Sequence, residues 1–211
     1  MRLRLTFRKT EPMRYTGHLD LHRTIERTFR RAGLPLAYSQ GYHPQPKINL
    51  AAALPLGFTS QCELADVWLE ETFELEKIGS ALAEAVPPGI EIVHIEPVDL
   101  RLPALQTQVR SAEYIATLLE ANHALDKRLA ELIAAESLPR ERRGKPYDLR
   151  PLIEDLVRIE DDVQNRPQLK MILAAREGAT GRPEEVLTAL NIAPETARVQ
   201  RTRLLFPDNL A

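Results

Sequence analysis

The sequence predicts an α+β protein in which one order of elements, strand, helix, strand, strand, helix, strand, occurs twice along 211 residues. Apolar residues alternating with polar ones mark the strands, and apolar residues at three- and four-residue spacing mark the helices. The two patterns follow in the same order in both halves, which predicts two ferredoxin-like domains with antiparallel sheets. We expect an N-terminal domain over 1–99, a linker over 100–109 and a C-terminal domain over 110–211.

In the first half, Leu3, Leu5 and Phe7 alternate with charged or polar residues and predict a strand with one buried face. A helix is predicted over 18–32, because apolar residues recur at helical spacing until Gly33. The elements expected next are a short strand over 36–38, strands over 47–54 and 62–69, a helix over 78–86 and a strand over 90–95.

The second half repeats this order with weaker strand signals in its middle. Pro139, Pro146, Pro151 and Pro167 fall in this region, and proline lacks the N–H that a sheet ladder needs. The predicted elements are a strand over 112–119, a helix over 124–135, strands over 152–159 and 169–175, a helix over 183–190 and a strand over 197–206.

The net charge of -2 results from cancellation between segments of opposite charge. Residues 1–50 hold ten Lys or Arg against three Asp or Glu, and residues 51–99 hold one Lys against ten Asp or Glu. Residues 100–211 balance, with seventeen of each sign. A uniformly basic nucleic-acid coat is therefore excluded, and we expect any anionic partner on the face built from the first fifty residues.

A single cysteine, Cys62, excludes a disulfide framework and any zinc site or iron–sulfur cluster built mainly from thiolates. The first residues alternate charged and apolar side chains, which is not the apolar run of a signal peptide. No stretch approaches the ~18 apolar residues of a membrane-spanning helix. We therefore expect a cytoplasmic protein with no membrane contact and no cofactor of its own.

The start of the predicted helix over 18–32 is a first candidate site. Arg14, His18 and the free N–H groups of the first helical turn suit an anion such as phosphate. His18 and His22 also have the spacing of two metal ligands, but the Glu of the HExxH pattern is absent, and we expect no metal there. A surface or packing role for both histidines stays open. The polar side of the same helix adds four candidate cations, Arg23, Arg27, Arg30 and Arg31.

Two loops complete the candidate sites. The loop over 38–49 carries Tyr42, His43 and Lys47, and rings interleaved with cations suit unpaired nucleotides. His43 is also a candidate general acid or base, and an ordinary stiff turn is the alternative for the whole loop. The segment over 140–150 is the second loop, which either follows a phosphate backbone or is a solvated loop. Its candidate contacts are Arg142, Arg143, Lys145 and Arg150.

Linked motifs over most of the chain resemble the radical SAM-linked protein family, a bacterial domain of unknown function. The motifs lie at 14–20, 27–35, 40–48, 53–57 and 147–153. The family often has Ser where this chain has Gly17, and Phe-Asn or Phe-Ser where it has Tyr42-His43. The second departure weakens a catalytic role for His43, because a mechanism shared by the family should not need it.

The resemblance implies a partner, a radical S-adenosylmethionine enzyme with a cobalamin-binding domain. This chain lacks the three-cysteine cluster motif, so radical chemistry would belong to that partner. The duplicated pattern is also similar to the RAMP superfamily of tandem ferredoxin-like proteins, which bind and sometimes cut CRISPR RNA. This RAMP-like similarity is an analogy of fold and says less about function.

Our leading hypothesis is an accessory module that binds RNA or presents a substrate to the radical SAM enzyme, and is not itself catalytic. One alternative is a metal-independent endoribonuclease in which His18 or His43 activates a 2′-hydroxyl and Lys47 or Arg23 stabilises the developing charge. Another is a protein-interaction scaffold that binds no RNA. The enzyme question stays open at this stage, with a non-catalytic role favoured.

Overall fold

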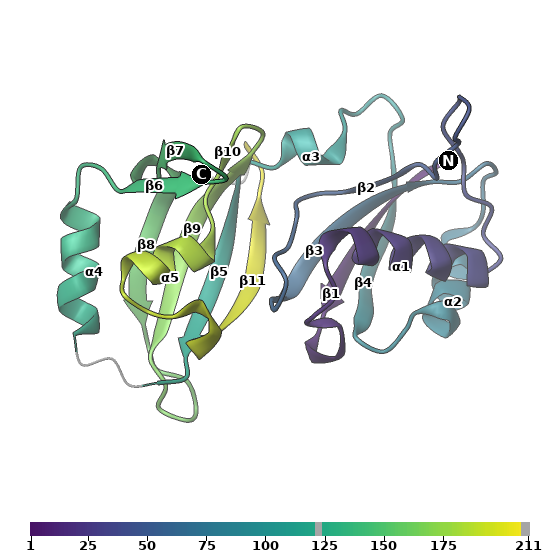
Figure 1. Ribbon diagram of the computed structural model, residues 1–211. Coiled ribbons are helices and arrows are strands. Elements are labelled where there is room, and N and C mark those ends of the chain that lie inside the picture. The colour runs from purple at the N-terminus through teal and green to yellow at the C-terminus, as the bar shows by residue number, and fades with distance from the viewer. Residues whose placement is uncertain (121–123, 208–211) are drawn as a thin grey trace. The chain divides into compact units, whose positions relative to one another are not determined.

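The computed structural model describes residues 1–120 and 124–207 and divides into two compact units, residues 1–109 and a second unit that begins at Arg110 (Figure 1). Both units combine helices with antiparallel strands, which confirms the predicted α+β class. The expected linker over 100–109 clusters with the first unit and contains a short helix. The last residues of the expected C-terminal domain, 208–211, lie outside the described residues.

The first unit contains four strands and three α-helices. Its strands pair antiparallel in the order β2-β3-β1-β4. The elements are β1 (Arg2–Lys9), a 3-10 turn (Glu11–Met13), α1 (His18–Arg31), β2 (Ile48–Leu50), β3 (Thr59–Trp68), α2 (Leu75–Ala85), β4 (Ile90–Val98) and α3 (Leu105–Gln108).

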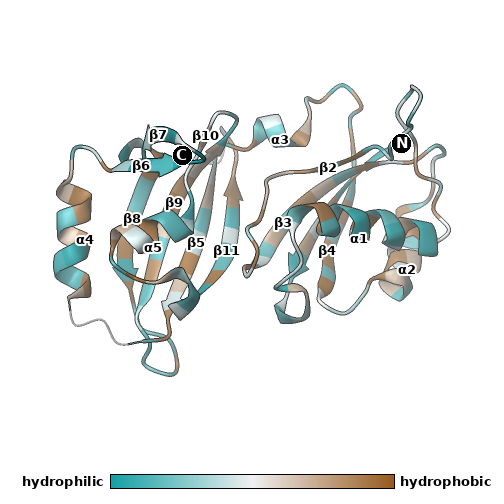
Figure 2. Ribbon diagram, viewed as in Figure 1, coloured by the Kyte–Doolittle hydropathy of each residue, from teal (hydrophilic) through white to brown (hydrophobic). Residues whose placement is uncertain are grey.

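One face of this sheet forms the core with α1 and α2. Leu3, Leu5 and Phe7 of β1 are fully buried, as their alternation predicts. They share a cluster with the apolar stripe of α1, which includes Ile25 and Phe29, and with α2. Hydrophilic and hydrophobic residues alternate along α1, as expected for an amphipathic helix (Figure 2).

The opposite face of the sheet holds a buried ion pair. Arg2 of β1 donates from Nη2 to Asp66 of β3 at 2.6 Å, and both side chains are shielded from solvent. Arg4 contacts the same carboxylate at 2.8 Å. The Arg2 guanidinium also donates to the carbonyls of Leu102 and Pro103, at 2.6 and 2.8 Å. These bonds attach the segment before α3 to the first unit, which explains why it is not a free linker.

The second unit has a four-stranded antiparallel sheet in the order β8-β9-β5-β11, with β10 added to the end of β9. A separate hairpin, β6–β7, precedes β8. The elements are β5 (Ser111–Leu118), α4 (Leu125–Ala134), β6 (Pro139–Arg142), β7 (Lys145–Asp148), a 3-10 turn (Arg150–Leu152), β8 (Ile153–Ile159), β9 (Gln168–Arg176), β10 (Ala179–Thr180), α5 (Pro183–Ala189), a 3-10 turn (Pro194–Thr196) and β11 (Ala197–Leu205).

Three local expectations differ from the structure. The short strand expected over 36–38 is reduced to two isolated bridges, and the strand expected over 47–54 shrinks to β2. The polar segment over 140–150, expected as a loop, instead forms most of the β6–β7 hairpin, Pro139–Asp148. Its turn is Arg143-Gly144, both with positive φ, 51° and 73°, which is the backbone that a two-residue hairpin turn requires. The flanking prolines obscure the strand pattern in the sequence, although an isolated hairpin tolerates them.

Within the described residues, no helix combines the length and the apolar character that crossing a membrane requires.

The buried ion pair of β1 predicts a large effect of one substitution. Arg2→Ala leaves the buried Asp66 with Arg4 as its remaining cation, and we expect the free energy of unfolding to fall by about 3 kcal/mol. Arg8→Ala on the same strand is the matched control, because the Arg8–Glu91 pair is exposed and spans 3.4 Å, and its loss should cost less than about 1 kcal/mol. Urea denaturation of both variants measures the difference, and equal losses would contradict it.

Candidate anion-binding site

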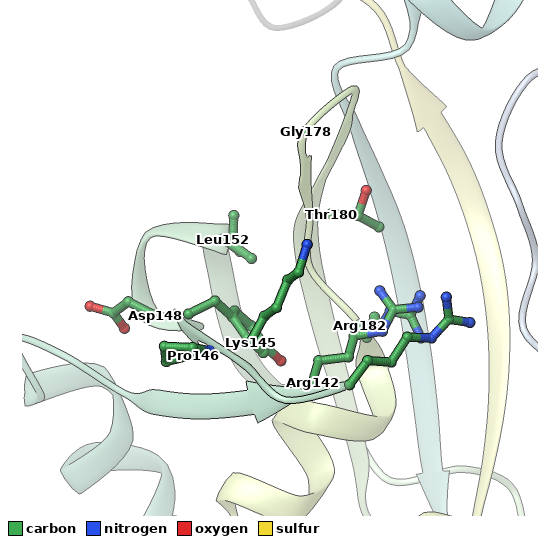
Figure 3. A pocket seen from close by; sticks show the side chains of 10 residues that line it. Arg142, Lys145, Pro146, Asp148, Leu152, Gly178, Thr180 and Arg182 are labelled. Atoms are coloured by element: carbon green, nitrogen blue, oxygen red, sulfur yellow. The ribbon is translucent and has the colours of Figure 1, made fainter.

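The second unit contains a cavity of about 690 Å³ between the β6–β7 hairpin and the turn that leads through β10 to α5 (Figure 3). Small-ligand sites commonly measure ~300–1,000 Å³, so this cavity has the size of a binding site. Four of its lining side chains are cationic, and one, that of Asp148, is a carboxylate. The lining residues are Arg142, Arg143, Lys145, Pro146, Tyr147, Asp148, Leu152, Gly178, Thr180 and Arg182.

The hairpin places two of these cations opposite each other. Arg142 and Lys145 are cross-strand partners next to the turn, so their side chains lie on the same face of the ribbon. Like charges in this position repel each other and destabilise the pair. Arg143, in the turn itself, adds a third cation. This concentration of positive charge is unfavourable alone and becomes favourable when an anion is bound.

Arg182, the residue just before α5, lines the same cavity although it lies far along the chain from the hairpin. The preceding residue, Gly181, packs so closely on the Leu152 carbonyl that a Cβ would lie 2.8 Å from that oxygen. Gly181 N–H also donates to the Ala174 carbonyl, at 2.8 Å, which fixes the chain just before Arg182. The Nε of Arg182 is buried and has no hydrogen-bond partner among residues 1–120 and 124–207. Figure 3 shows the guanidinium groups of Arg142 and Arg182 on the same side of the cavity.

The neighbouring carboxylates do not neutralise these cations. Asp148 accepts hydrogen bonds from the backbone N–H groups of Leu138 and Arg150, at 2.7 and 2.9 Å, and these bonds hold its pKa below the usual range. Its carboxylate points away from the guanidinium groups in Figure 3. Glu185 approaches Arg140 at 4.0 Å. Within residues 1–120 and 124–207, Arg142, Arg143, Lys145 and Arg182 form no ion pair with a carboxylate.

Burial affects the two other titratable groups beside the cavity. Burial raises the pKa of Glu184, against the opposing effect of the nearby charges of Arg182 and Arg142. Burial and the charge of Glu185 raise the pKa of the Tyr147 phenol, which lines the cavity. The arrangement suits a phosphate group, because guanidinium forks bind phosphate oxygens in pairs and a lysine supplies a point charge.

The structure gives some predicted anion contacts a structural role. Arg150 donates to the Ile133 carbonyl in the last turn of α4, at 3.2 Å, and to the carbonyl of Ala135, the residue after α4, at 3.1 Å. Arg14 is buried and donates to the Gly57 carbonyl at 2.6 Å. Arg31 donates to the Ala85 carbonyl at 2.6 Å, where α2 ends. These guanidinium groups hold backbone segments together.

The other candidates of the first unit are more exposed. Arg30 pairs with Glu26 at 2.8 Å and donates to the Tyr38 hydroxyl at 2.7 Å, and Arg23 lies 3.3 Å from Asp20. Arg27 is exposed on the same helix, and His18 is half-buried at its first residue. The remaining three, Tyr42, His43 and Lys47, are exposed in the segment before β2, with Tyr42 fully in solvent.

The prediction therefore identified three of the four cavity cations, Arg142, Arg143 and Lys145, and missed Arg182. Arg182 lies 32 residues beyond the predicted basic segment, and only the Gly-Arg-Pro sequence at the start of α5 marks its position. Within the described residues, no group of three or more His, Cys, Asp or Glu side chains is arranged to hold a metal ion.

The fold and this cavity define an α+β protein of two units with a cation-lined cavity in the second. The chain belongs to a family described as uncharacterized proteins conserved in bacteria (DUF2344), whose model matches residues 2–183 and thus includes all four cavity cations. No curated protein matches the chain.

Two crystal structures have similar chains, at low scores. The small subunit of acetolactate synthase from Thermotoga maritima is 13% identical with a TM-score of 0.28, over 97% of this chain and 94% of that chain. A putative glycine cleavage system transcriptional repressor is 8% identical with a TM-score of 0.26, over 97% of both chains. Similarity at these scores carries no argument about the fold or function of this protein.

The carboxylate of Asp148 predicts a pH-dependent contribution to stability. Its pKa is lowered in the folded state, so its stabilisation is complete above the ordinary carboxyl pKa of about 4 and is lost as the pH falls through the folded value. We expect Asp148→Ala to lower the melting temperature at pH 7 and to have a much smaller effect near pH 3. Glu131→Ala, at an exposed carboxylate on α4, should change it little at either pH. Thermal melts monitored by circular dichroism test this, and a pH-independent loss would contradict it.

Proposed function

We propose that this protein is an accessory module that binds RNA and presents it to a radical SAM enzyme, without being the catalyst itself. The cationic cavity of the second unit carries this proposal, because it has the size of a ligand and is lined by four cations that form no ion pair with a carboxylate among the described residues. RNA supplies a phosphate at every linkage, and phosphate contacts dominate the affinity of proteins for nucleic acids.

The fold supports the same proposal at a coarser level. With their principal strands numbered one to four along the chain, both units have the order 4-1-3-2, and in both a helix connects strand one to strand two and another connects strand three to strand four. We infer that the units are two copies of one ferredoxin-like arrangement, and that the RAMP-like analogy extends to both. Open sheets of this connectivity are one of the common platforms for single-stranded RNA.

The proposed partner follows from the resemblance to the radical SAM-linked family. The 211 residues contain a single cysteine, so they cannot supply the three thiolate ligands of a radical SAM cluster. In this arrangement the present chain holds the nucleic acid and the partner supplies the reaction, in the cytoplasm. The electrostatic contribution of the cavity makes the RNA affinity dependent on salt.

Charge removal in the cavity should weaken RNA binding. We expect Arg142→Gln and Arg182→Gln each to reduce the affinity for a fluorescein-labelled RNA about tenfold at low salt, because each removes a charge-assisted hydrogen bond to phosphate. Each substitution should also reduce the magnitude of the slope of log affinity against log salt concentration by about 1, the value expected for the loss of one phosphate contact. Fluorescence anisotropy at two salt concentrations measures both quantities.

Lys127→Gln is the control for these variants, because it removes the same charge from an exposed position on α4, outside the cavity. It should bind RNA like the unmodified protein. Absence of RNA affinity, an affinity that salt does not weaken, or equal losses in all three variants would overturn the proposal.

The proposed partnership is tested by co-purification with the radical SAM enzyme from the same cell, with the captured material analysed for protein and RNA. Recovery of both supports an RNA-presenting module. Recovery of the enzyme without RNA would instead establish the scaffold alternative, and RNA shortened during incubation in EDTA would establish an endoribonuclease.

A further inference from the structure

A second cavity, of about 380 Å³, lies in the first unit beside the only tryptophan of the chain, Trp68. It is bordered by the end of β3, by β2 and by the segment before β2. The lining residues are Ser39, Gln45, Pro46, Lys47, Ile48, Asn49 and Trp68. The cavity therefore combines one large aromatic ring with polar side chains and one cation.

The sheet register places Trp68 on the face opposite the core. Leu3 and its partner Val67 point into the core, and because side chains alternate along a strand, Arg2 and its partner Trp68 point to the other face. The Arg2 guanidinium lies 4.8 Å from the centre of the Trp68 ring, and the Asp66 carboxylate holds Arg2 in that position. The indole is thus fixed in orientation before any ligand binds.

The polar groups around the ring are available for a ligand. Gln45 and Asn49 offer amide groups that can both donate and accept, and their side chains make no hydrogen bond within the part of the chain that the structure describes. The ammonium group of Lys47 likewise forms no ion pair there. The backbone beneath these side chains is held by sheet-like bonds, from Lys47 N–H to the Ala37 carbonyl and from Trp68 N–H to the Lys47 carbonyl.

We propose that this cavity binds one unpaired nucleobase, which lies against the Trp68 indole and presents its edge to Asn49 and Gln45, with Lys47 on the adjoining phosphate. A nucleobase has a π-face for the ring and a mixed donor and acceptor edge for the amides. The base has to be unpaired, because in a duplex both of its faces are stacked and its edge is paired. This inference rests on the proposed RNA binding and specifies the class of RNA as single-stranded.

The fluorescence of Trp68 reports on this site alone, because the chain has no other tryptophan. We expect a single-stranded RNA dodecamer to quench the emission in a saturable manner, since base stacking on an indole quenches it. The same dodecamer annealed to its complement should leave the emission unchanged at equal concentration. Adenosine monophosphate should quench only at much higher concentration, because it carries one phosphate where the dodecamer offers several.

Substitutions separate the ring from its surroundings. Trp68→Ala should weaken binding of a labelled single-stranded dodecamer roughly tenfold, the loss of one base stack, and Asn49→Ala should weaken it several-fold. Tyr15→Ala is the control, because it removes an exposed ring outside the cavity and should have no effect. If Trp68→Ala fails to fold, the inference is still tested by the affinity of Asn49→Ala and by the Trp68 emission of the unmodified protein.

The inference is overturned if bound single-stranded RNA leaves the emission of Trp68 unchanged, or if duplex RNA quenches it equally. It is also overturned if Asn49→Ala and Tyr15→Ala bind alike. The general proposal of RNA binding would still be supported in that case if the binding depends on salt and is weakened by Arg142→Gln and Arg182→Gln. Absence of any RNA affinity refutes both the general proposal and this one.

Discussion

The buried ion pair between Arg2 and Asp66 is the interaction on which the first unit depends most. It joins the two central strands, β1 and β3, on the face opposite the core that α1 and α2 form. The same guanidinium holds the Leu102 and Pro103 carbonyls and lies over the Trp68 ring. A buried charge tolerates no rearrangement that would leave it unpaired. The position of the indole, and with it the shape of the cavity beside it, therefore follows from an electrostatic constraint.

In the second unit, in contrast to the paired charges of Arg2 and Asp66, the cations of the cavity are not paired with carboxylates of the described residues. Its cavity concentrates four cations that lack carboxylate partners within the described residues, on a two-residue hairpin and on the residue after a closely packed glycine. Repulsion within such a group has to be offset by the stability of the surrounding fold, for example by the backbone N–H groups that fix Asp148 at the base of the hairpin. Charge that is satisfied internally stabilises structure, whereas charge left without a partner is available to a ligand.

Particular residues show how far sequence reasoning reached. The alternation of Leu3, Leu5 and Phe7 predicted β1 and its buried face, and the helical spacing up to Gly33 predicted α1. The hairpin was missed because Pro139 and Pro146 hide its strand pattern. Basic residues alone did not distinguish Arg142, which lines a cavity, from Arg150, which holds the end of α4. That distinction depends on which carbonyls lie within reach, and no local pattern encodes it.

The sequence by itself predicted the class of fold, the principal strands and helices, and the basic segment that contains three of the four cavity cations, because hydrophobic periodicity and local charge are properties of neighbouring residues. The tertiary structure alone decided that Arg182 joins Arg142, Arg143 and Lys145, and that Trp68 meets Asn49 and Lys47. These residues are separated along the chain and converge only through strand pairing and close backbone packing. Long-range contacts of this kind depend on the whole fold, and so they were visible only in the structure.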